Sequence, residues 1–419
     1  MLFLLIVIIT TLLFAYLYSK KYKDIFNPLI LFIVPIAISF IVNCIYYDPI
    51  QEISDATYQI YGTGVLSFAV GVLLCTMVPH AYNGNKKNIT PNALVFDIYI
   101  LASIIGTICA VIYIIKGSGI HAYGNNFMRN IRYYSLYVSP PSGLSKYGII
   151  FCGVILNYLL YDVFVNGKKN KHNKRLLFTM TFMYCIFMMV TFARTVMFDL
   201  FARIIFFVYL GFAKKNKKSR LTTNTLRFYF LIFMVGILVL FIFTFIAAKT
   251  GKSFGAGGAS WLISYFGAEF SVFQKYILSI PGALKGGASL GVISRVLRLF
   301  PFLPQKEAYA DHALHMQGLG GPVSSFVSNP YLDFGIVGVV LIMIIYGYII
   351  SYIYLRHKHS GGIWTMFFAT CIYQCIIAFF SFQFGLTSQI YEMVALLILF
   401  GIKTERGNVT YKYQLFKTY

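Results

Sequence analysis

The sequence predicts an all-helical protein that crosses a membrane many times. Of its 419 residues, 58% are hydrophobic and only 11% are charged, and the mean hydropathy is +0.73. Soluble globular chains carry about 25% charged residues, so this composition excludes a water-soluble enzyme, a nucleic-acid-binding module and a disordered chain. The apolar residues form runs long enough to cross a hydrocarbon core about 30 Å thick, which needs ~17–25 residues per helix.

These runs predict an all-α polytopic integral membrane protein with about 11 (11–12) transmembrane helices, and residues 1–419 are expected to form a single membrane domain. The sixth and seventh runs are short and are joined by a tight turn. In chain order the runs are Leu2–Tyr18, Phe26–Tyr47, Tyr58–Val78, Leu94–Ile115, Tyr147–Val165, Leu176–Val190, Val196–Phe212, Phe228–Ala248, Val327–Leu355, Ile363–Phe380 and Leu386–Ile402.

The basic residues between the runs predict how the chain is threaded. Most of the 35 lysines and arginines gather in alternate connecting segments, whereas the short segment Asp48–Thr57 has none. Because cytoplasmic loops carry the excess of basic residues, we expect the N-terminus outside and the C-terminus in the cytoplasm. The two longest loops, 116–146 and 249–326, are then external. The second lies between the eighth and ninth helices and is expected to contain interfacial helices, since Trp261–Ile280 reads as amphipathic.

The cysteines and the longest basic run need no further function. All seven cysteines lie inside apolar runs, and none is in a polar loop where a disulfide framework or a zinc site would be expected. We expect Cys371 and Cys375, one helical turn apart, to act as small packing residues. The basic run 214–218 resembles a nucleic-acid-binding patch, but its place in a cytoplasmic loop accounts for it.

The external loops contain residue types suited to a phosphorylated, sugar-bearing ligand. Arginine offers a planar charged fork to phosphate, aromatic rings offer flat faces to sugars, and histidine or a carboxylate can accept a proton from a hydroxyl. The alternative is that these side chains are solvated charges and contacts to anionic lipid headgroups. The candidates are Arg132, Tyr133 and Tyr134 in the first loop, and Trp261, Arg295, Arg298, Asp311, His312 and His315 in the second.

Charged residues also occur within the runs or at their ends. Asp199 and Arg203 are four residues apart, which favours a structural ion pair on one helix face. Arg194 lies in the tight external turn, where we expect a functional role. Glu392 has no assigned partner. Asp333 opens the ninth run, where capping of the helix and a catalytic role are equally open.

Two short motifs resemble a known family, the O-antigen polymerases, or Wzy-type oligosaccharide repeat unit polymerases. The first is the run from Ser325 through Asn329-Pro330-Tyr331-Leu332-Asp333-Phe334-Gly335 to Gly338, followed by an apolar helix with Tyr346-Gly347. The second is Phe192-Ala193-Arg194-Thr195, similar to the family's small-Arg-Thr element. The family's external loops are described by an Arg with a Gly sixteen positions later. Arg132 and Gly148 fit that spacing, whereas neither Arg295 nor Arg298 has such a glycine.

The resemblance implies a metal-independent, GT-C-like glycosyltransferase of the inner membrane that needs no cofactor. It would polymerise undecaprenyl-diphosphate-linked oligosaccharide units, which serve as donor and acceptor, at the periplasmic face. A chain-length regulator protein is an implied partner, as is the lipid bilayer, and nucleic acid is not. The N-terminus would then be periplasmic and the C-terminus cytoplasmic.

A mechanism combines the resemblance with the residues. The diphosphate of the growing chain would be held by Arg194, Arg295, Arg298 and Arg132. His312, His315 or Asp311 would act as the base toward the incoming hydroxyl, and the sequence leaves open which. Sugar rings would contact Tyr133, Tyr134, Trp261 and Asp333.

Two other functions compete with polymerisation. An O-antigen ligase differs only in its acceptor, and the family resemblance extends to it. A lipid-linked oligosaccharide flippase is the non-enzymatic alternative, but it should place its charges in a central cavity and does not need a long external loop. O-antigen, capsule and related polymers fit the sequence equally.

Overall fold

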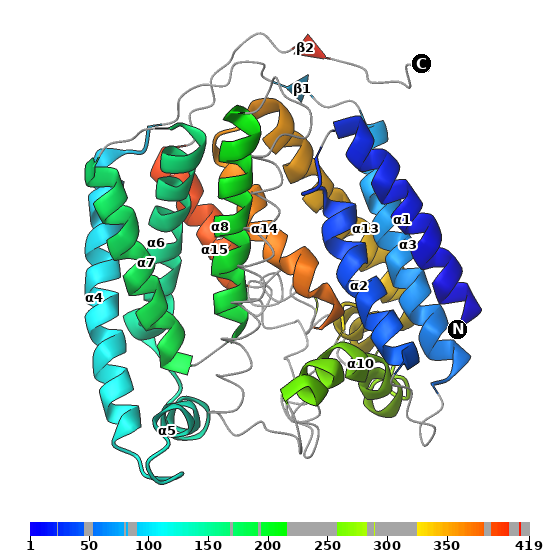
Figure 1. Ribbon diagram of the computed structural model, residues 1–419, viewed down its shortest axis with the longest axis horizontal. Coiled ribbons are helices and arrows are strands. Elements are labelled where there is room, and N and C mark those ends of the chain that lie inside the picture. The colour runs from blue at the N-terminus through cyan, green and yellow to red at the C-terminus, as the bar shows by residue number, and fades with distance from the viewer. Residues whose placement is uncertain are drawn as a thin grey trace, which may run out of the picture.

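The structure, a computed structural model, is a bundle of long helices (Figure 1). It describes residues 1–22, 24–45, 53–78, 81–82, 90–167, 171–191, 194–215, 258–282, 289, 325–380, 387–401 and 410–411. The α-helices are α1 (Leu2–Tyr22), α2 (Pro28–Ile45), α3 (Asp55–Met77), α4 (Ala93–Ser118), α5 (Phe127–Tyr133), α6 (Gly143–Leu160), α7 (Lys171–Thr191), α8 (Arg194–Lys215), α10 (Gly258–Tyr276), α13 (Ser328–Ser360), α14 (Ile363–Ile376) and α15 (Thr387–Phe400). Short elements are the π-helical turns η1 (Tyr134–Val138) and η2 (Tyr161–Val165), the 3-10 turn η3 (Ile377–Phe379) and the paired strands β1 (Ala81–Tyr82) and β2 (Thr410–Tyr411).

The predicted class, a helical polytopic membrane protein, agrees with this architecture. Seven helices in the described ranges are long and apolar enough to cross a membrane: Leu2–Tyr22, Pro28–Ile45, Asp55–Met77, Ala93–Ser118, Gly143–Val165, Val196–Lys214 and Ser328–Ser360. The apolar helices Ile363–Phe379 and Ser388–Phe400 are shorter. The predicted run Phe228–Ala248 lies outside the described residues, so the count of eleven stays a prediction.

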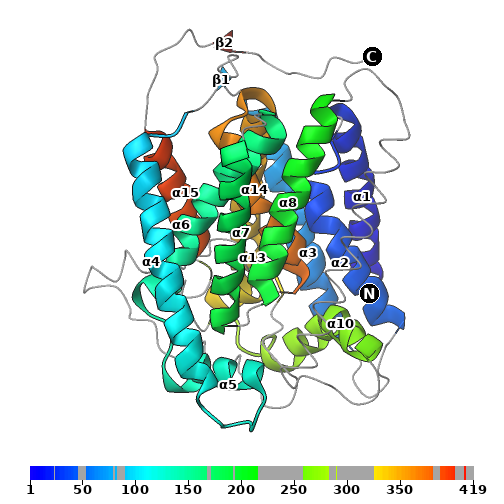
Figure 2. The ribbon, with the colours of Figure 1, turned by 60° about the vertical axis from the view of Figure 1, so that its left-hand side comes forward.

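Two groups of helices are joined through the middle of the bundle. α1, α2, α3 and α13 pack together on one side, and α4, α6 and α7 pack together on the other. α14 contacts α13, α2 and α8, while α15 contacts both α14 and α6, so these late helices connect the groups (Figures 1 and 2). In an α-helix the backbone N–H and C=O groups hydrogen-bond to one another, as they must in the hydrocarbon core of a membrane.

α3 and α13 pack closely against each other at two glycines. A Cβ atom placed on Gly347 would lie 2.2 Å from the carbonyl oxygen of Phe68, and one placed on Gly71 would lie 2.2 Å from the carbonyl oxygen of Ile344. Only glycine lets the two backbones come this near, a pattern common where membrane helices pack tightly. These glycines therefore fix the distance between α3 and α13.

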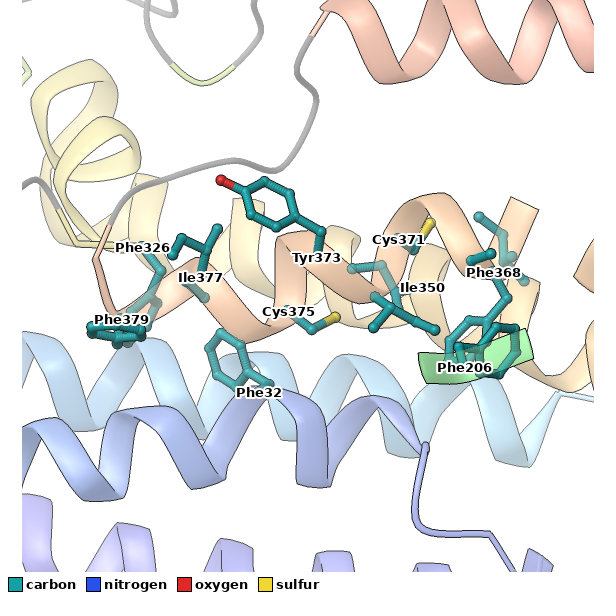
Figure 3. Packing of buried hydrophobic residues seen from close by; sticks show 14 of the residues in the cluster. Phe32, Phe206, Phe326, Ile350, Phe368, Cys371, Tyr373, Cys375, Ile377 and Phe379 are labelled. Carbon is teal, nitrogen blue, oxygen red and sulfur yellow. The ribbon is translucent and has the colours of Figure 1, made fainter. Parts of the chain in front are cut away.

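The core of the bundle lies around α14. Figure 3 shows Cys371, Tyr373 and Cys375 of α14 among apolar side chains that include Phe32 of α2 and Phe206 of α8. Both cysteines are buried and free. The prediction that they pack as small apolar residues is confirmed.

α13 is broken near its start. Phe334 and Gly335 leave helical geometry, and Gly335 has a φ of 64°, which an L side chain rarely adopts. The first part of α13 is therefore a short separate turn, and the long membrane helix begins after Gly335.

The bundle has two distinct ends. α5 and α10 lie at one of them, which we call the α10 end, and β1 and β2 lie at the other (Figure 1). The N-terminus also lies at the α10 end, where the Met1 amine is 2.8 Å from Asp55 Oδ1. The loops 116–146 and 249–326 were both predicted to be external, and their helices α5 and α10 do share one end of the bundle.

Candidate functional site

α5 carries the predicted arginine and two tyrosines of the first loop. The helix begins after Asn126, whose side-chain oxygen accepts a hydrogen bond from the backbone nitrogen of Arg129 at 3.2 Å. Arg132 lies in its last turn, Tyr133 ends it, and Tyr134 opens the π-helical turn η1. All three predicted residues are half-buried. The three residues are consecutive at the junction of α5 and η1, at the α10 end.

Both tyrosines pack against other rings. The centroid of Tyr133 is 5.7 Å from that of Tyr123 and 5.3 Å from that of Tyr137. Tyr134 lies 5.0 Å from Tyr113 of α4. These contacts make an aromatic cluster beside Arg132. Whether its exposed faces bind sugar stays a prediction.

The other predicted residues fall into two groups. Arg194 is the first residue of α8 and Trp261 lies near the start of α10, so both backbone positions belong to the α10 end. The remaining predicted residues lie outside the described ranges: Arg295, Arg298, Asp311, His312 and His315.

Asp333 anchors the segment that follows α10. It is 1% exposed, and its Oδ2 accepts hydrogen bonds from the backbone nitrogen of Ser289 at 2.6 Å and from the Ser289 hydroxyl. In the same turn, the Tyr331 hydroxyl donates to the carbonyl of Leu278 at 3.2 Å, and the Tyr331 carbonyl accepts from Gly282 at 3.1 Å. The motif therefore ties α13 to the segment that follows α10. The predicted contact of Asp333 with sugar stays a prediction.

Glu269 of α10 is a buried carboxyl group that the sequence reading did not select. It is 0% exposed. Its Oε1 contacts the hydroxyl of Ser39 in α2, and its backbone carbonyl accepts from the Tyr61 hydroxyl in α3 at 3.2 Å. Its Oε2 has no hydrogen-bond partner. α10 is therefore held across the ends of α2 and α3 around this residue.

The contacts of Ser39 indicate that Glu269 is neutral. The Ser39 oxygen lies within hydrogen-bonding distance of two oxygens, the carbonyl of Phe266 and Oε1 of Glu269. A hydroxyl has one proton to donate, so the second contact is satisfied when Glu269 itself carries a proton and donates it to Ser39. Burial acts in the same direction, because it raises the pKa of Glu269 well above its ordinary value, opposed only by the Ser39 hydrogen bond.

We expect this carboxyl to make the protein less stable as pH rises. The raised pKa means that the folded protein holds a proton that the unfolded chain releases above about pH 4.3. The contribution is fully present below that pH and is lost at about 1.4 kcal/mol per pH unit as pH rises toward the folded-state pKa. Thermal unfolding measured as the pH rises from about 5 should show a steeper loss of stability in the wild type than in Glu269→Gln.

Asp55→Asn is the matched control, because the Asp55 side chain is 84% exposed and its pairing with the N-terminus is solvated. It should keep the wild-type slope. Equal slopes for wild type and Glu269→Gln would contradict a neutral Glu269.

A second buried polar group lies inside the bundle. Arg203 of α8 is 2% exposed and contacts two carboxylates. Its Nε and Nη2 donate to Asp199 at 2.9 and 2.6 Å, while Nη2 donates to Glu392 Oε2 at 2.9 Å and Nη1 donates to Glu392 Oε1. We call Asp199, Arg203 and Glu392 the charge cluster. It confirms the predicted Asp199–Arg203 pair and gives Glu392, on α15, its partner.

Two neutral side chains complete the charge cluster. The Asn157 amide of α6 donates to Glu392 Oε1 at 2.6 Å, and the Tyr184 hydroxyl of α7 donates to Asp199 at 3.3 Å. The cluster thus links α6, α7, α8 and α15. The sequence indicates this cluster only through three ionisable residues in apolar runs, because ionisable side chains within a membrane commonly pair with one another.

Metal binding finds no support in the described ranges, where no three His, Cys, Asp or Glu side chains come together as a metal-binding group. A metal-independent reaction stays a prediction.

Comparison with known proteins does not identify a family for this chain. No protein-family model, curated protein or solved structure matches the chain. The function is therefore argued from the residues and the fold.

Proposed function

We propose that the protein polymerises lipid-linked oligosaccharide repeat units by glycosyl transfer at the outer face of the inner membrane, as O-antigen polymerases do. The observation that carries the proposal is the gathering of candidate ligand-binding residues at one end of the bundle. Arg132 and the aromatic cluster on α5, the start of α8 with Arg194, and α10 with Trp261 all belong to the α10 end. The proposal takes this end as periplasmic and a GT-C-like bundle of 11–12 spans as the full fold.

The proposed reaction is a transfer between two lipid-linked substrates. A hydroxyl of the incoming unit forms a bond to the anomeric carbon of the growing chain, and the bond from that carbon to the undecaprenyl diphosphate breaks. Arg132 and Arg194, with Arg295 and Arg298, neutralise the leaving diphosphate, because guanidinium groups can bind phosphate oxygens in pairs. A base from the late loop, His312 in the first instance, takes the hydroxyl proton.

A flippase is the second candidate, and the charge cluster is the observation that favours it. Charged residues inside membrane spans commonly mark the path of a transported ion or substrate. Arg203 lies within α8 and Glu392 within α15, and both side chains are buried and paired with each other.

Deleting the gene and identifying the glycolipid that accumulates tests these functions against one another. We expect lipopolysaccharide capped with a single repeat unit, the product of a missing polymerase. Undecaprenyl-linked polymer would instead indicate a ligase, and repeat units retained in the cytoplasmic leaflet would indicate a flippase. Normal surface polysaccharide would contradict all three.

Arg132→Ala should reduce the yield of long polymer about tenfold to hundredfold, because one charge-assisted hydrogen bond to phosphate contributes about 1.5–3 kcal/mol. The measurement is gel analysis of polymer length in the complemented deletion strain. Lys146→Ala is the control, since Lys146 is an exposed cation near the start of α6 that is not among the proposed diphosphate ligands. Full-length polymer from Arg132→Ala at wild-type yield would remove Arg132 from the site.

A further inference from the structure

The charge cluster contains one negative charge more than it can balance. Arg203 supplies one positive charge, while Asp199 and Glu392 supply two negative charges when both are ionised. Among the side chains that the structure describes, both carboxylates form their ion pairs with Arg203. An unbalanced charge in the interior of a membrane protein is costly, and a carboxyl group avoids this cost by taking up a proton.

Within the described ranges, the groups that face the cluster from the neighbouring helices supply no second cation. Tyr184 lies on α7, Cys152 on α6 and Cys371 on α14, and each interacts electrostatically with members of the cluster. These side chains are uncharged at neutral pH unless they lose a proton, which would add negative charge. Among the described side chains none balances the excess charge, and a proton taken up from solution would do so.

The contacts of Asn157 indicate that the proton is carried by Glu392. Its amide nitrogen donates to Glu392 Oε1 at 2.6 Å, while its amide oxygen is buried without a hydrogen-bond partner. Oxygen and nitrogen of an amide occupy nearly equivalent positions. Rotation of the amide therefore presents an acceptor to Glu392, as a protonated carboxyl requires.

Asp199 is the less suitable carrier. Its two oxygens receive the fork of Arg203 from the same helix, together with the Tyr184 hydroxyl. Both oxygens of Glu392 also receive Arg203, from Nη1 and Nη2, so the guanidinium does not distinguish the two carboxylates. What distinguishes them is the Asn157 amide beside Glu392, whose oxygen has no hydrogen-bond partner and can accept a proton from Glu392. Glu392 is therefore the group to be neutralised.

We propose that the charge cluster is a proton-binding site inside the membrane, in which Glu392 carries one exchangeable proton and Asn157 is its hydrogen-bond partner. Because Glu392 is on α15, Arg203 on α8 and Asn157 on α6, uptake or release of this proton changes the contacts among three helices. This site does not depend on the proposed polymerase activity, and it serves an enzyme or a transporter equally.

Infrared spectroscopy of the full-length protein in lipid nanodiscs tests the proposal directly. A protonated carboxyl has a C=O band well separated from that of a carboxylate. We expect the wild type at neutral pH to show protonated-carboxyl bands from Glu269 and Glu392, of which Glu392→Gln loses the second. Asp199→Asn should also lose the Glu392 band, because Arg203 then balances an ionised Glu392. The proposal is overturned if wild type and Glu392→Gln differ only in carboxylate bands, or if the Glu392 band persists in Asp199→Asn.

A second variant keeps the test decisive if Glu392→Gln does not fold. Asn157→Leu preserves the carboxyl and removes its partner, so the same band should move to the higher frequency of a carboxyl without that hydrogen bond. An unchanged band in this variant would exclude Asn157 as the partner and overturn the assignment.

Sodium is the competing ligand. Thermal unfolding in sodium chloride and in choline chloride should give equal midpoints for the wild type if the ligand is a proton. A midpoint raised by sodium in the wild type but not in Glu392→Gln would show that the charge cluster binds sodium instead, and would overturn the proposal.

Discussion

Replacing Arg203 with alanine should lower the free energy of unfolding by about 3–5 kcal/mol, the cost of breaking a buried ion pair by removing one partner. The variant leaves Asp199 and Glu392 facing each other in the bundle without the guanidinium that both contact. The expected result is a large fall in the unfolding midpoint of the purified protein in detergent. Wild-type stability would contradict the structural importance of the charge cluster.

Two controls separate charge from packing in this experiment. Arg175→Ala removes an exposed arginine near the start of α7 and should change stability by no more than about 0.5 kcal/mol. The triple variant Asp199→Leu, Arg203→Met, Glu392→Leu replaces the whole cluster with apolar side chains. Since such replacements are often neutral or stabilising, it should be more stable than Arg203→Ala alone.

Gly347→Val should cost about 3 kcal/mol by forcing α3 and α13 apart. The new Cβ would lie 2.2 Å from the carbonyl oxygen of Phe68, and this oxygen belongs to a backbone that cannot rotate away. The measurement is again the unfolding midpoint, together with the yield of monodisperse protein.

Gly119→Ala is the matched control for this glycine. The nearest atom to a Cβ at Gly119 is 3.6 Å away and its φ is −72°, so alanine fits without strain. Its stability should stay within about 0.5 kcal/mol of the wild type. If Gly347→Val behaved in the same way, the close packing of α3 on α13 would be wrong.

Sequence predicted the helices because the requirement for apolar length is local. Each described run is helical in the structure, and the predicted non-spanning segment Trp261–Ile280 overlaps α10 (Gly258–Tyr276). The observed helix boundaries differ from the predicted ones, among other places at the start of α6 and the start of α13. α6 begins at Gly143, before the apolar run, because polar residues such as Ser145 and Lys146 can extend a helix beyond the hydrocarbon. α13 breaks at Gly335, which hydropathy does not register.

The polar contacts inside the bundle could not be predicted in the same way. Asp199 and Arg203 are four residues apart, so helix geometry alone brings them together. Glu392 reaches Arg203 from a helix far along the chain, and Ser39 reaches Glu269 across a similar separation. Such pairs depend on which helices become neighbours, and a single sequence does not reveal this.

The packing of α3 on α13 has a consequence for how the protein is made. α3 is synthesised early, yet the nearest neighbour of Gly71 is the backbone of α13, which leaves the ribosome late. Contacts between distant parts of a chain form last, after the cost of closing the intervening loop has been met. α3 therefore enters the membrane before its partner helix has been made. Its packing is completed only when α13 has also been inserted.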